Sequence, residues 1–392
     1  MKSPYYSAKF SGISADEIQT QADFEQLPFS DKADLRNAYP LGLQAVPNEE
    51  IIRIHSSSGT TGQAVIIPYT RRDVENWSIM MARCFEMSGL TKTDRVQITP
   101  GYGLWTAGIG FQAGCERLGA MCIPTGPGNT ERQLKMMLDL KTTAIAATSS
   151  YALILAEQIE KQNLREHLAL RCGIIGSERW SAKMRQRIEK GLGIELFDIY
   201  GLTECYGPGI ANECHYHDGL HYFDDFVYFE VIDPSTGQVL PQGETGELVI
   251  TTLCKEGAPL IRYRTHDLTH LITDPCPCGS AFPRHGRIIG RTDDMIKIKG
   301  TNIFPAQVDM LLGSVAGASS EYRLRLDRKE GRDRLTVLFE CEQDADNVAV
   351  THQVIAAFKS QIGIKVEALP YPIGGLERSE KKTQRVIDER NV

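Results

Sequence analysis

Strand-like and helix-like segments alternate along the middle of this 392-residue sequence, and this alternation constrains the fold more than any other feature. The apolar runs that predict strands are Arg95–Thr99, Met121–Pro124, Ala144–Ala147, Cys172–Ile175 and Glu195–Ile199. The stretches that predict helices are Val74–Ser88, the apolar Trp105–Leu118, Thr130–Leu140, Tyr151–Lys161 and Ser181 to about Gly191. Such spacing predicts βαβ units, a largely parallel sheet and an α/β fold. Thr130 and Gln133 are expected to form a capping box at the start of their helix.

Two different patterns follow the alternating region. Strands expected at Val227–Ile232, Gly246–Leu253 and Leu260–Tyr263 indicate a small antiparallel β region at about residues 224–290. Beyond it, the sequence predicts helices at Phe304–Leu312 and Val348–Ile362 and strands at Tyr322–Leu326, Leu335–Glu340 and Lys365–Leu369. We therefore expect a large N-terminal domain, residues 1–292, and a small α+β domain, residues 293–392. Residues 1–50 predict short helices broken by prolines, with no chemically distinctive side chains.

A loop of small residues lies between two apolar runs, Ile51–Ile54 and Ala64–Ile67. It consists of Ser56, Ser57, Ser58, Gly59, Thr60, Thr61 and Gly62. Hydroxyl groups and closely approaching backbone N–H groups are suited to an anion such as phosphate. The Gly-Lys-Ser/Thr ending of the Walker loop is absent, and a flexible polar hairpin loop is the alternative.

Composition excludes several classes of protein. Hydrophobic residues make up 42% of the chain and charged residues 24%, as in globular proteins, and the net charge of −7 argues against general nucleic-acid or anionic-membrane binding. No apolar run reaches the roughly 18 residues of a membrane helix. The first residues lack the apolar core of a signal peptide, and the ten cysteines form no disulfide framework. We therefore expect a cytoplasmic protein without nucleic-acid or membrane partners.

Five segments, in this order, resemble the motifs of the AMP-forming acyl-adenylate ligases. They are SSSGTTG at 56–62, YGLTE at 200–204, YRTHD at 263–267, GRTDDMIKIKG at 290–300 and RSEKKTQR at 378–385. Residues 29–44, 101–118 and 301–307 are similar to the phenylacetate–CoA ligase branch in particular. The resemblance extends from about Pro4 to Asn391, although the N-terminus is shorter than usual for that branch. It implies a reaction in which ATP and a carboxylic acid give acyl-AMP and pyrophosphate, and CoA then takes the acyl group.

The resemblance also assigns residues to the nucleotide. It implies that loop 56–62 holds the β- and γ-phosphates, that Thr203 binds the α-phosphate and that Glu204 binds Mg²⁺. It places Asp267 on the ribose hydroxyls and Arg291 on ribose or phosphate. The remaining nucleotide contacts are expected from two strand-end loops, at Ser177, Glu178, Tyr200 and Gly201. Tyr200 would lie against the adenine.

The C-terminal segment is expected to supply the catalytic lysine. Lys382 matches a lysine that bridges the carboxylate and the α-phosphate, with Lys381 as the alternative and a solvated charged tail as the ordinary interpretation. A hinge at Asp293 would rotate the small domain between the two half-reactions, and Lys297 and Gly300 would then line the path of CoA. The sequence departs from the family at Gln63, where many relatives carry lysine, and at Lys381, where they carry glycine.

Aromatic and small residues flank the loops expected to hold the acid. They are Tyr102, Trp105, Tyr206 and Gly207. Such residues suit a flat apolar acid, for example an arylacetic acid, although aromatic residues at helical spacing are often ordinary core.

Two cysteines separated by one residue, Cys276 and Cys278, form a knuckle-like turn before Gly279. A Cys/His cluster about sixty residues upstream can complete a tetrahedral set. We hypothesise a structural Zn²⁺ held by Cys214, His221, Cys276 and Cys278. His215 or His217 are alternatives to His221, and unmodified thiols with exposed histidines are the alternative to a metal site.

Two other functions remain open at this point. An adenylating enzyme can pass its acyl group to a carrier-protein phosphopantetheine or to an amine, and a chain with altered motifs can be a catalytically silent nucleotide-binding protein. The expected ligands are ATP, Mg²⁺, CoA, Zn²⁺ and a small carboxylic acid, with an acyl carrier protein and a second copy of the chain as further candidate partners.

Overall fold

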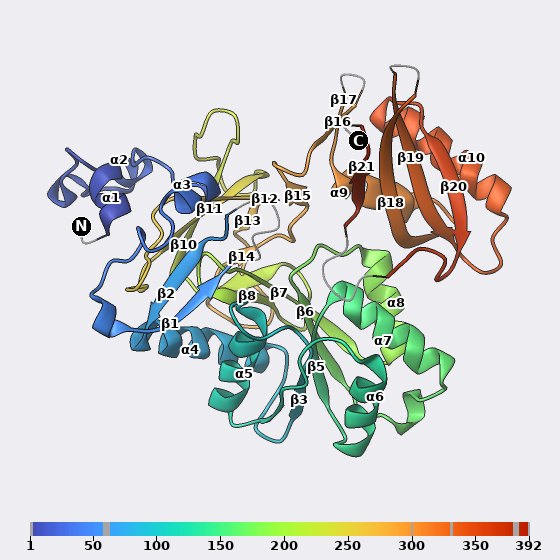
Figure 1. The fold of residues 1–392 in the computed structure, drawn as a ribbon, viewed down its shortest axis with the longest axis horizontal. Coiled ribbons are helices and arrows are strands. Elements are labelled where there is room, and N and C mark those ends of the chain that lie inside the picture. Colours follow the sequence, from blue (N-terminus) through green and yellow to red (C-terminus); the bar gives the residue numbers. More distant parts are fainter. Residues whose placement is uncertain (1–2, 58–62, 299–300, 330–331, 379–383, 391–392) are drawn as a thin grey trace. The chain divides into compact units, whose positions relative to one another are not determined.

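The computed structural model describes residues 3–57, 63–298, 301–329, 332–378 and 384–390. Their contacts divide the chain into two units (Figure 1). Unit 1 comprises Met1–Ala147, Leu168–Ser177 and Glu195–Ile288, and unit 2 comprises Thr148–His167, Glu178–Ile194 and Ile289–Val392. Two helices from the middle of the sequence therefore group with the C-terminal segment. The boundary expected at residues 292 and 293 stays a prediction.

A nine-stranded sheet forms the centre of unit 1, in the order β13-β14-β9-β8-β7-β6-β5-β3-β4. Its strands are β3 (Arg95–Ile98), β4 (Met121–Ile123), β5 (Ala144–Thr148), β6 (Cys172–Gly176), β7 (Glu195–Leu202), β8 (Gly207–Glu213), β9 (Leu220–Tyr222), β13 (Leu271–Ile272) and β14 (Arg284–His285). Pairing is parallel where helices connect the strands, as between β3 and β5 and between β6 and β7. It is antiparallel from β7 through β8, β9 and β14 to β13. The prediction of a largely parallel sheet is thus correct for one half only, since short connections from β7 to β8 and from β8 to β9 reverse the direction of the chain.

Three helices of unit 1 follow the predicted stretches: α4 (Arg71–Met87), α5 (Ala107–Leu118) and α6 (Thr130–Asp139). The side chain of Thr70 caps α4, and Asp73 completes the capping box. The capping box predicted at Thr130 is wrong by one residue, because Asn129 is the N-cap and accepts from the backbone N–H of Arg132. Gln133 is buried instead and donates to the carbonyl of Gly126.

The N-terminal segment contains α1 (Pro4–Lys9), α2 (Gln21–Glu25) and α3 (Lys32–Asn37), as the prolines predicted. Arg262 holds this segment in place. Its buried guanidinium pairs with Glu230 at 2.9 Å and donates to the backbone carbonyls of Glu25 and Leu27, the latter at 2.8 Å. The N–H of Ser30 donates to the carbonyl of Arg262 at 3.1 Å.

Two smaller sheets complete unit 1. β1 (Ile51–Ser56) and β2 (Ile66–Thr70) form an antiparallel hairpin in which Ser56 pairs with Ile66. β10 (Val227–Ile232), β11 (Gly246–Thr252) and β12 (Tyr263–Thr269) form the predicted antiparallel β region. The prediction for the last strand is wrong in its bounds. The backbone N–H groups of residues 260–262 donate to side-chain hydroxyls elsewhere in unit 1, and the strand begins at Tyr263.

Unit 2 combines α7 (Ser149–Lys161) and α8 (Ala182–Leu192) with the C-terminal segment. That segment contains β15 (Gly290–Arg291), the β16 (Ile296–Ile298) and β17 (Thr301–Ile303) hairpin, α9 (Pro305–Ser314) and α10 (Asn347–Ala357). β18 (Ala318–Lys329), β19 (Arg332–Cys341), β20 (Glu367–Pro372) and β21 (Val386–Asp388) form its sheet in the order β20-β19-β18-β21. The sequence did not predict β21, which pairs parallel to β18.

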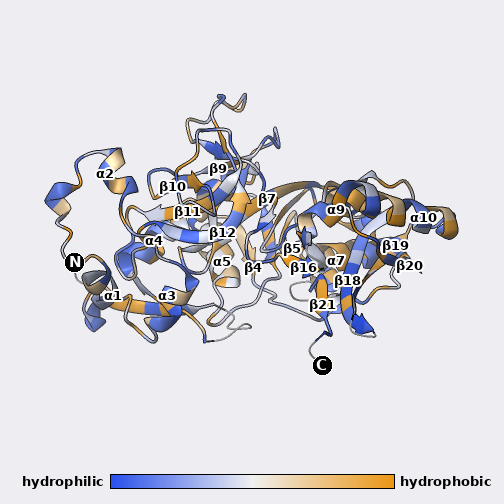
Figure 2. Cartoon of the chain, turned by 90° about the horizontal axis from the view of Figure 1, so that it is seen from above, coloured by the Kyte–Doolittle hydropathy of each residue, from blue (hydrophilic) through white to orange (hydrophobic). Residues whose placement is uncertain are grey.

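Hydrophilic residues interrupt the hydrophobic ones along the labelled helices (Figure 2). Within the described ranges, no helix is both long enough and apolar enough to span a bilayer.

Candidate active site and metal centre

The hairpin of β1 and β2 fixes both ends of the predicted phosphate loop. Ser56 ends β1, and its N–H donates to the carbonyl of Leu104 at 2.9 Å. The N–H of Ser57 donates to the carbonyl of Val65 at 3.1 Å, and the N–H of Val65 donates to Ser57 Oγ at 3.0 Å. Residues Ser58, Gly59, Thr60, Thr61 and Gly62 lie outside the described residues.

The same hairpin lies beside the segment that carries Thr203 and Glu204. Tyr69 on β2 donates its hydroxyl to the carbonyl of Tyr206 at 2.8 Å. Thr106, two residues after the Leu104 that holds Ser56, forms a hydroxyl–hydroxyl hydrogen bond with Thr203 at 3.2 Å. Two motifs that are about 140 residues apart in sequence therefore share one neighbourhood in unit 1.

The segment Tyr200–Glu204 was expected to be a strand-end loop, and this is partly wrong. β7 continues through Leu202 because Tyr200, Gly201 and Leu202 pair with β8, and the turn begins only at Thr203. The side chain of Glu204 is 7% exposed, and its Oε1 lies 3.2 Å from the Nζ of Lys32. Lys32 was missed, since nothing in residues 1–50 distinguishes this lysine from other surface lysines.

Tyr200 and Asp267 are in direct contact. The Tyr200 hydroxyl donates to Asp267 Oδ2 at 2.7 Å, and the ring meets His285 edge to face at a centroid distance of 5.3 Å. Asp267 lies on β12 and is largely buried. A tyrosine ring and a carboxylate held together in this way can offer one flat surface and one acceptor group to the same ligand.

Other predicted nucleotide contacts engage neighbours of their own. Ser177 directly follows β6 and has a left-handed conformation, with φ of 69°. Glu178 Oε2 accepts hydrogen bonds from the N–H and hydroxyl of Ser150, at 3.0 and 2.6 Å, and so anchors the start of α7. Arg291 forms a two-pronged ion pair with Asp293, with distances of 2.8 and 2.9 Å. The residue expected at the nucleotide and the expected hinge are therefore partners.

The C-terminal predictions fall partly outside the described residues, since Lys381, Lys382 and Gly300 are not among them. Both flanks of the lysine segment are anchored in unit 2. Arg378 pairs with Glu340 at 2.7 Å and with Glu157 of α7 at 2.8 Å. Arg385 pairs with Glu321 at 3.1 Å. Lys297 is exposed on β16, and its carbonyl accepts from Arg390 at 2.9 Å.

The residues predicted to line the acyl pocket come from two segments, the one that leads into α5 and the turn from β7 into β8. Tyr102 packs so closely on this helix that a Cβ on Gly108 would come within 2.8 Å of its ring. Trp105 is half-buried, and its ring would lie 3.2 Å from a Cβ on Gly101. Tyr206 is fully buried, and Gly207 approaches Trp77 with φ of 115°. The sequence gives no reason to single out Trp77.

A buried lysine lies against this aromatic group and was not predicted. The ammonium group of Lys255 is centred 3.8 Å from the Tyr69 ring and 4.4 Å from the Tyr206 ring. Its Nζ has no hydrogen-bond partner among the described residues. Burial lowers the pKa of Lys255 to about 8. Nothing in the sequence around Lys255 distinguishes it from a surface lysine.

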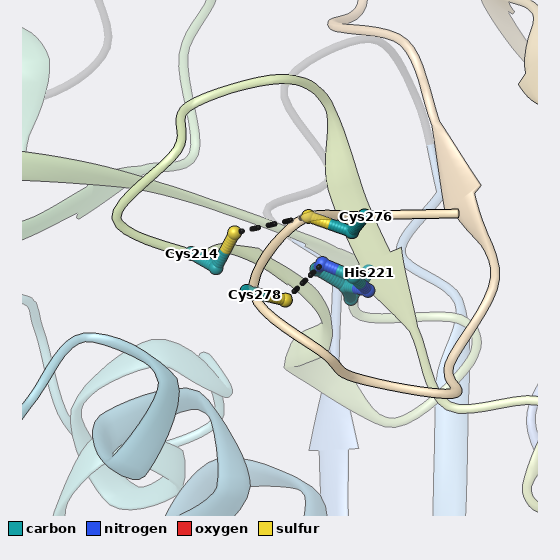
Figure 3. Close-up of side chains that lie close together, drawn as sticks. All are labelled: Cys214, His221, Cys276 and Cys278. Carbon is teal, nitrogen blue, oxygen red and sulfur yellow. Dashed lines mark hydrogen bonds between the residues drawn. The ribbon is translucent and has the colours of Figure 1, made fainter. Parts of the chain in front are cut away.

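The predicted metal ligands come together in unit 1 (Figure 3). The ligand atoms of Cys214, His221, Cys276 and Cys278 all lie within 4.8 Å of one another. Cys214 Sγ is 3.6 Å from Cys276 Sγ, and Cys278 Sγ is 3.4 Å from His221 Nε2. The Nδ1–H of His221 donates to the carbonyl of Phe282 at 2.8 Å, which directs Nε2 toward the thiols.

The two alternative histidines are not part of this cluster. His217 lies between two carboxylates, at 3.1 Å from Glu213 and 2.9 Å from Glu195. The ring of His215 packs against Tyr216 at a centroid distance of 4.4 Å. Of the histidines considered, His221 is therefore the one that the fold brings to the cysteines.

Comparison with known proteins agrees with the geometry. The family described as "AMP-binding enzyme" matches residues 11–254, and "AMP-binding enzyme C-terminal domain" matches residues 300–390. Phenylacetate–coenzyme A ligase of Pseudomonas putida is 41% identical, over 99% of this chain and 90% of its own. The enzymes of the same name from Escherichia coli and Thermus thermophilus are 39% and 36% identical, over 99% and 97% of this chain and 91% and 90% of their own.

Solved structures give the same assignment. The structure of 2-hydroxyisobutyryl-CoA ligase in the postadenylation state, in complex with 2-HIB-AMP, has a TM-score of 0.89 and 28% identity, covering 99% of this chain and 86% of that one. Its structure with 2-HIB-AMP and CoA in the thioesterification state has a TM-score of 0.71 and 28% identity, and the match covers 100% of this chain and 86% of that one. The chain therefore belongs to the AMP-binding enzyme family and is an AMP-forming acid–CoA ligase of the phenylacetate–CoA ligase type.

Proposed function

We propose that this ligase activates an arylacetic acid, such as phenylacetate, as its acyl-AMP and transfers the acyl group to CoA. The contact between Thr106 and Thr203 carries the proposal, because it joins the segment bearing Tyr102 and Trp105 to the Tyr-Gly-Leu-Thr-Glu motif. A flat acid held beside these aromatic side chains would present its carboxylate near the hydroxyl pair. The names of the relatives support the same acid class.

Positioning is the main task of the residues at such a site, since the carboxylate must attack the α-phosphorus in line. In the proposal, Thr203 donates to the α-phosphate, Asp267 accepts from the ribose and the ring of Tyr200 supports the adenine. The hydrogen bond from Tyr200 to Asp267 fixes these two side chains before the nucleotide arrives. Arg291 would have to exchange Asp293 for the ribose or phosphate.

Glu204 is the proposed ligand of Mg²⁺. Its buried carboxylate already faces a cation, because the Lys32 ammonium group lies 3.2 Å away, and an oxygen ligand in such a place fits a hard divalent ion. When bound, Mg²⁺ would neutralise charge on the phosphate oxygens. The proposal further assigns Lys382 to the carboxylate and α-phosphate during adenylation. Asp293 is the hinge, and Lys297 and Gly300 line the CoA path in the second half-reaction.

Acid-dependent exchange between ATP and labelled pyrophosphate tests this proposal. A panel of arylacetic, benzoic, hydroxy and straight-chain acids is offered, with CoA or a holo acyl carrier protein as the acceptor in a second assay. We expect exchange to be fastest with arylacetic acids, AMP as the product and the thioester on CoA. Faster exchange with another class would reject the acid assignment, and faster transfer to the carrier protein would reject CoA as the acceptor.

We also propose that Cys214, His221, Cys276 and Cys278 bind a structural Zn²⁺. Three thiols and one imidazole nitrogen within 4.8 Å are a donor set that suits tetrahedral zinc, and the N–H of Ser280 donates to Cys278 Sγ at 3.4 Å. The ligands come from the loop after β8, from β9 and from the turn before β14, so a metal would tie together three parts of the sheet edge.

Metal analysis and thermal unfolding of Cys276→Ser test the zinc proposal, with Cys254→Ser as the control because this half-buried thiol lies outside the cluster. We expect about one zinc per chain in the wild type, loss of that zinc in Cys276→Ser, and a Tm lower by several degrees. Wild-type protein purified with zinc present but containing no zinc, and with all three thiols reactive, would reject the site.

A further inference from the structure

Lys32 offers the only ion-pair partner of Glu204 that the described ranges contain. The pair joins an N-terminal helix to a residue 172 positions later, and the two members differ in exposure: the side chain of Glu204 is 7% exposed and that of Lys32 is 36% exposed. The carboxylate is therefore fixed in the protein interior, whereas the ammonium group can leave it for another anion nearby without entering an apolar region.

The backbone of Lys32 is held firmly although its side chain is half-exposed. Asp31 caps α3 through the N–H of Asp34, and Asp34 is itself paired with Lys9 at 2.8 Å. Two residues before Lys32, the carbonyl of Ser30 accepts from the N–H of Arg264 at 2.8 Å, close to the strand that carries Asp267. The lysine thus reaches toward Glu204 from a fixed point beside the proposed nucleotide site.

The predicted phosphate loop supplies no cation of its own. From Ser56 to Ala64 every residue is neutral, including Gln63, whereas the triphosphate of ATP carries about four negative charges. The ammonium group of Lys255 does not supply this charge either, because it is buried against the rings of Tyr69 and Tyr206. Besides Mg²⁺ and the contacts proposed for Arg291 and Lys382, a cation for the outer phosphates would have to come from elsewhere in the chain.

We propose that Lys32 is a phosphate-binding residue of this enzyme: its ammonium group pairs with Glu204 before the nucleotide binds, and would pair with the β- or γ-phosphate once the Glu204 carboxylate holds Mg²⁺. The inference rests on the proposed role of Glu204. It assigns a nucleotide contact to the N-terminal segment, in which the sequence showed no chemical residue. The exchange of partners keeps both the carboxylate and the lysine paired in each state.

Binding of a nucleotide that cannot react tests this proposal without relying on turnover. The probes are α,β-methylene-ATP with Mg²⁺, which has all three phosphates, and AMP, which lacks the outer two. We expect Lys32→Met to weaken binding of the methylene analogue by about tenfold to a hundredfold, the worth of one charged hydrogen bond, and to leave AMP binding within about twofold. Lys32→Arg should retain most of the affinity for the analogue.

Two further variants sharpen the test. Lys135→Met is the matched control, because it removes an exposed lysine whose ion-pair partner, Asp139, lies on the same helix α6, and it should bind both probes like the wild type. In Lys32→Met/Gln63→Lys, a new cation directly follows the loop, and we expect the affinity for the analogue to recover. If Lys32→Met fails to fold, Lys32→Gln, which keeps a polar side chain, replaces it.

The outcomes separate this inference from the proposed function. Equal loss of AMP and analogue binding in Lys32→Met, or unchanged binding of both, would reject Lys32 as a phosphate ligand while the wild type still binds and exchanges pyrophosphate. A wild type that binds neither probe, or that shows no acid-dependent exchange, would instead reject the proposed function.

Discussion

The hydroxyl of Tyr200 donates a hydrogen bond to Asp267 over 2.7 Å. This bond joins the end of β7 to β12, two strands of different sheets in unit 1. It fixes the position of the tyrosine ring relative to the carboxylate. A hydrogen bond from a phenol to a carboxylate is stronger than one between neutral groups. In the proposed site, the two motifs would therefore act as one nucleotide-binding group.

Tyr200→Phe should weaken AMP binding about threefold to tenfold, because it removes this orienting bond while keeping the ring. Asp267→Asn should have a larger effect, since it also removes the charge of the acceptor. Isothermal titration with AMP measures both. The control is Tyr228→Phe, whose hydroxyl contacts Gln21 at 3.3 Å on an exposed face and should matter little. AMP affinity unchanged in Tyr200→Phe would contradict the orienting role.

Gly207→Ala should destabilise the protein strongly. Its φ of 115° is unfavourable for a side chain, and a Cβ would lie 2.5 Å from the Trp77 ring and 2.9 Å from Thr106 Cβ. Gly243→Ala, with φ of 88° and no atom within 4 Å of the new Cβ, carries the backbone strain alone. We expect Gly207→Ala to lower the free energy of unfolding, measured in urea, by about 2 kcal/mol more than Gly243→Ala does. Equal losses of stability in the two variants would contradict the prediction, because they would mean that the Trp77 ring moves to accommodate the methyl group.

Lys255 should make stability depend on pH in a defined direction. Its pKa is about 8 in the fold, below the roughly 10.4 of an unfolded lysine. Between these pH values the unfolded chain binds a proton that the folded chain lacks, so the stability of the fold rises with pH. Below about pH 8 the lysine is protonated in both states, and the fold carries the full cost of burying the charge.

The measurement for Lys255 compares urea unfolding of the wild type and Lys255→Met from pH 7 to pH 10. Above pH 8, the free energy of unfolding of the wild type should rise relative to that of the variant by about 1.4 kcal/mol for each pH unit. Lys92→Met, which removes an exposed lysine, should follow the wild-type profile. Parallel profiles for wild type and Lys255→Met would show that the ammonium group is not desolvated.

Lys382→Ala should impair adenylation and spare the second half-reaction. We expect pyrophosphate exchange to fall by about a hundredfold or more, because a charge contact at the reacting phosphate is lost. Thioester formation from preformed acyl-AMP and CoA should stay near the wild-type rate. Lys381→Ala is the control and decides between the two adjacent lysines. Equal loss of both half-reactions in Lys382→Ala would contradict a lysine that serves only the first.

Much of the fold could be predicted from local patterns. The helices α4 to α8 lie at the stretches predicted to be helical, and β10 has the predicted bounds. The start of β12 could not be predicted, because Leu260, Ile261 and Arg262 give their N–H groups to Thr252, Tyr6 and Thr251 side chains. Such bonds depend on residues far away in the sequence, which an apolar run does not reveal.

The site divides in the same way. The four candidate metal ligands could be predicted because cysteine pairs and nearby histidines are chemically distinctive in sequence. Lys32 and Lys255 could not, since an ordinary lysine acquires its role only when folding brings it to Glu204 or to the rings of Tyr69 and Tyr206.

The buried guanidinium of Arg262 has a practical consequence for engineering this chain. Two of its acceptors are backbone carbonyls of the N-terminal segment, at Glu25 and Leu27, and no side-chain substitution can remove them. Deleting residues 1–28 would leave a desolvated cation with Glu230 alone, and trimmed or fused versions of the enzyme that discard this segment should therefore be recovered as insoluble material.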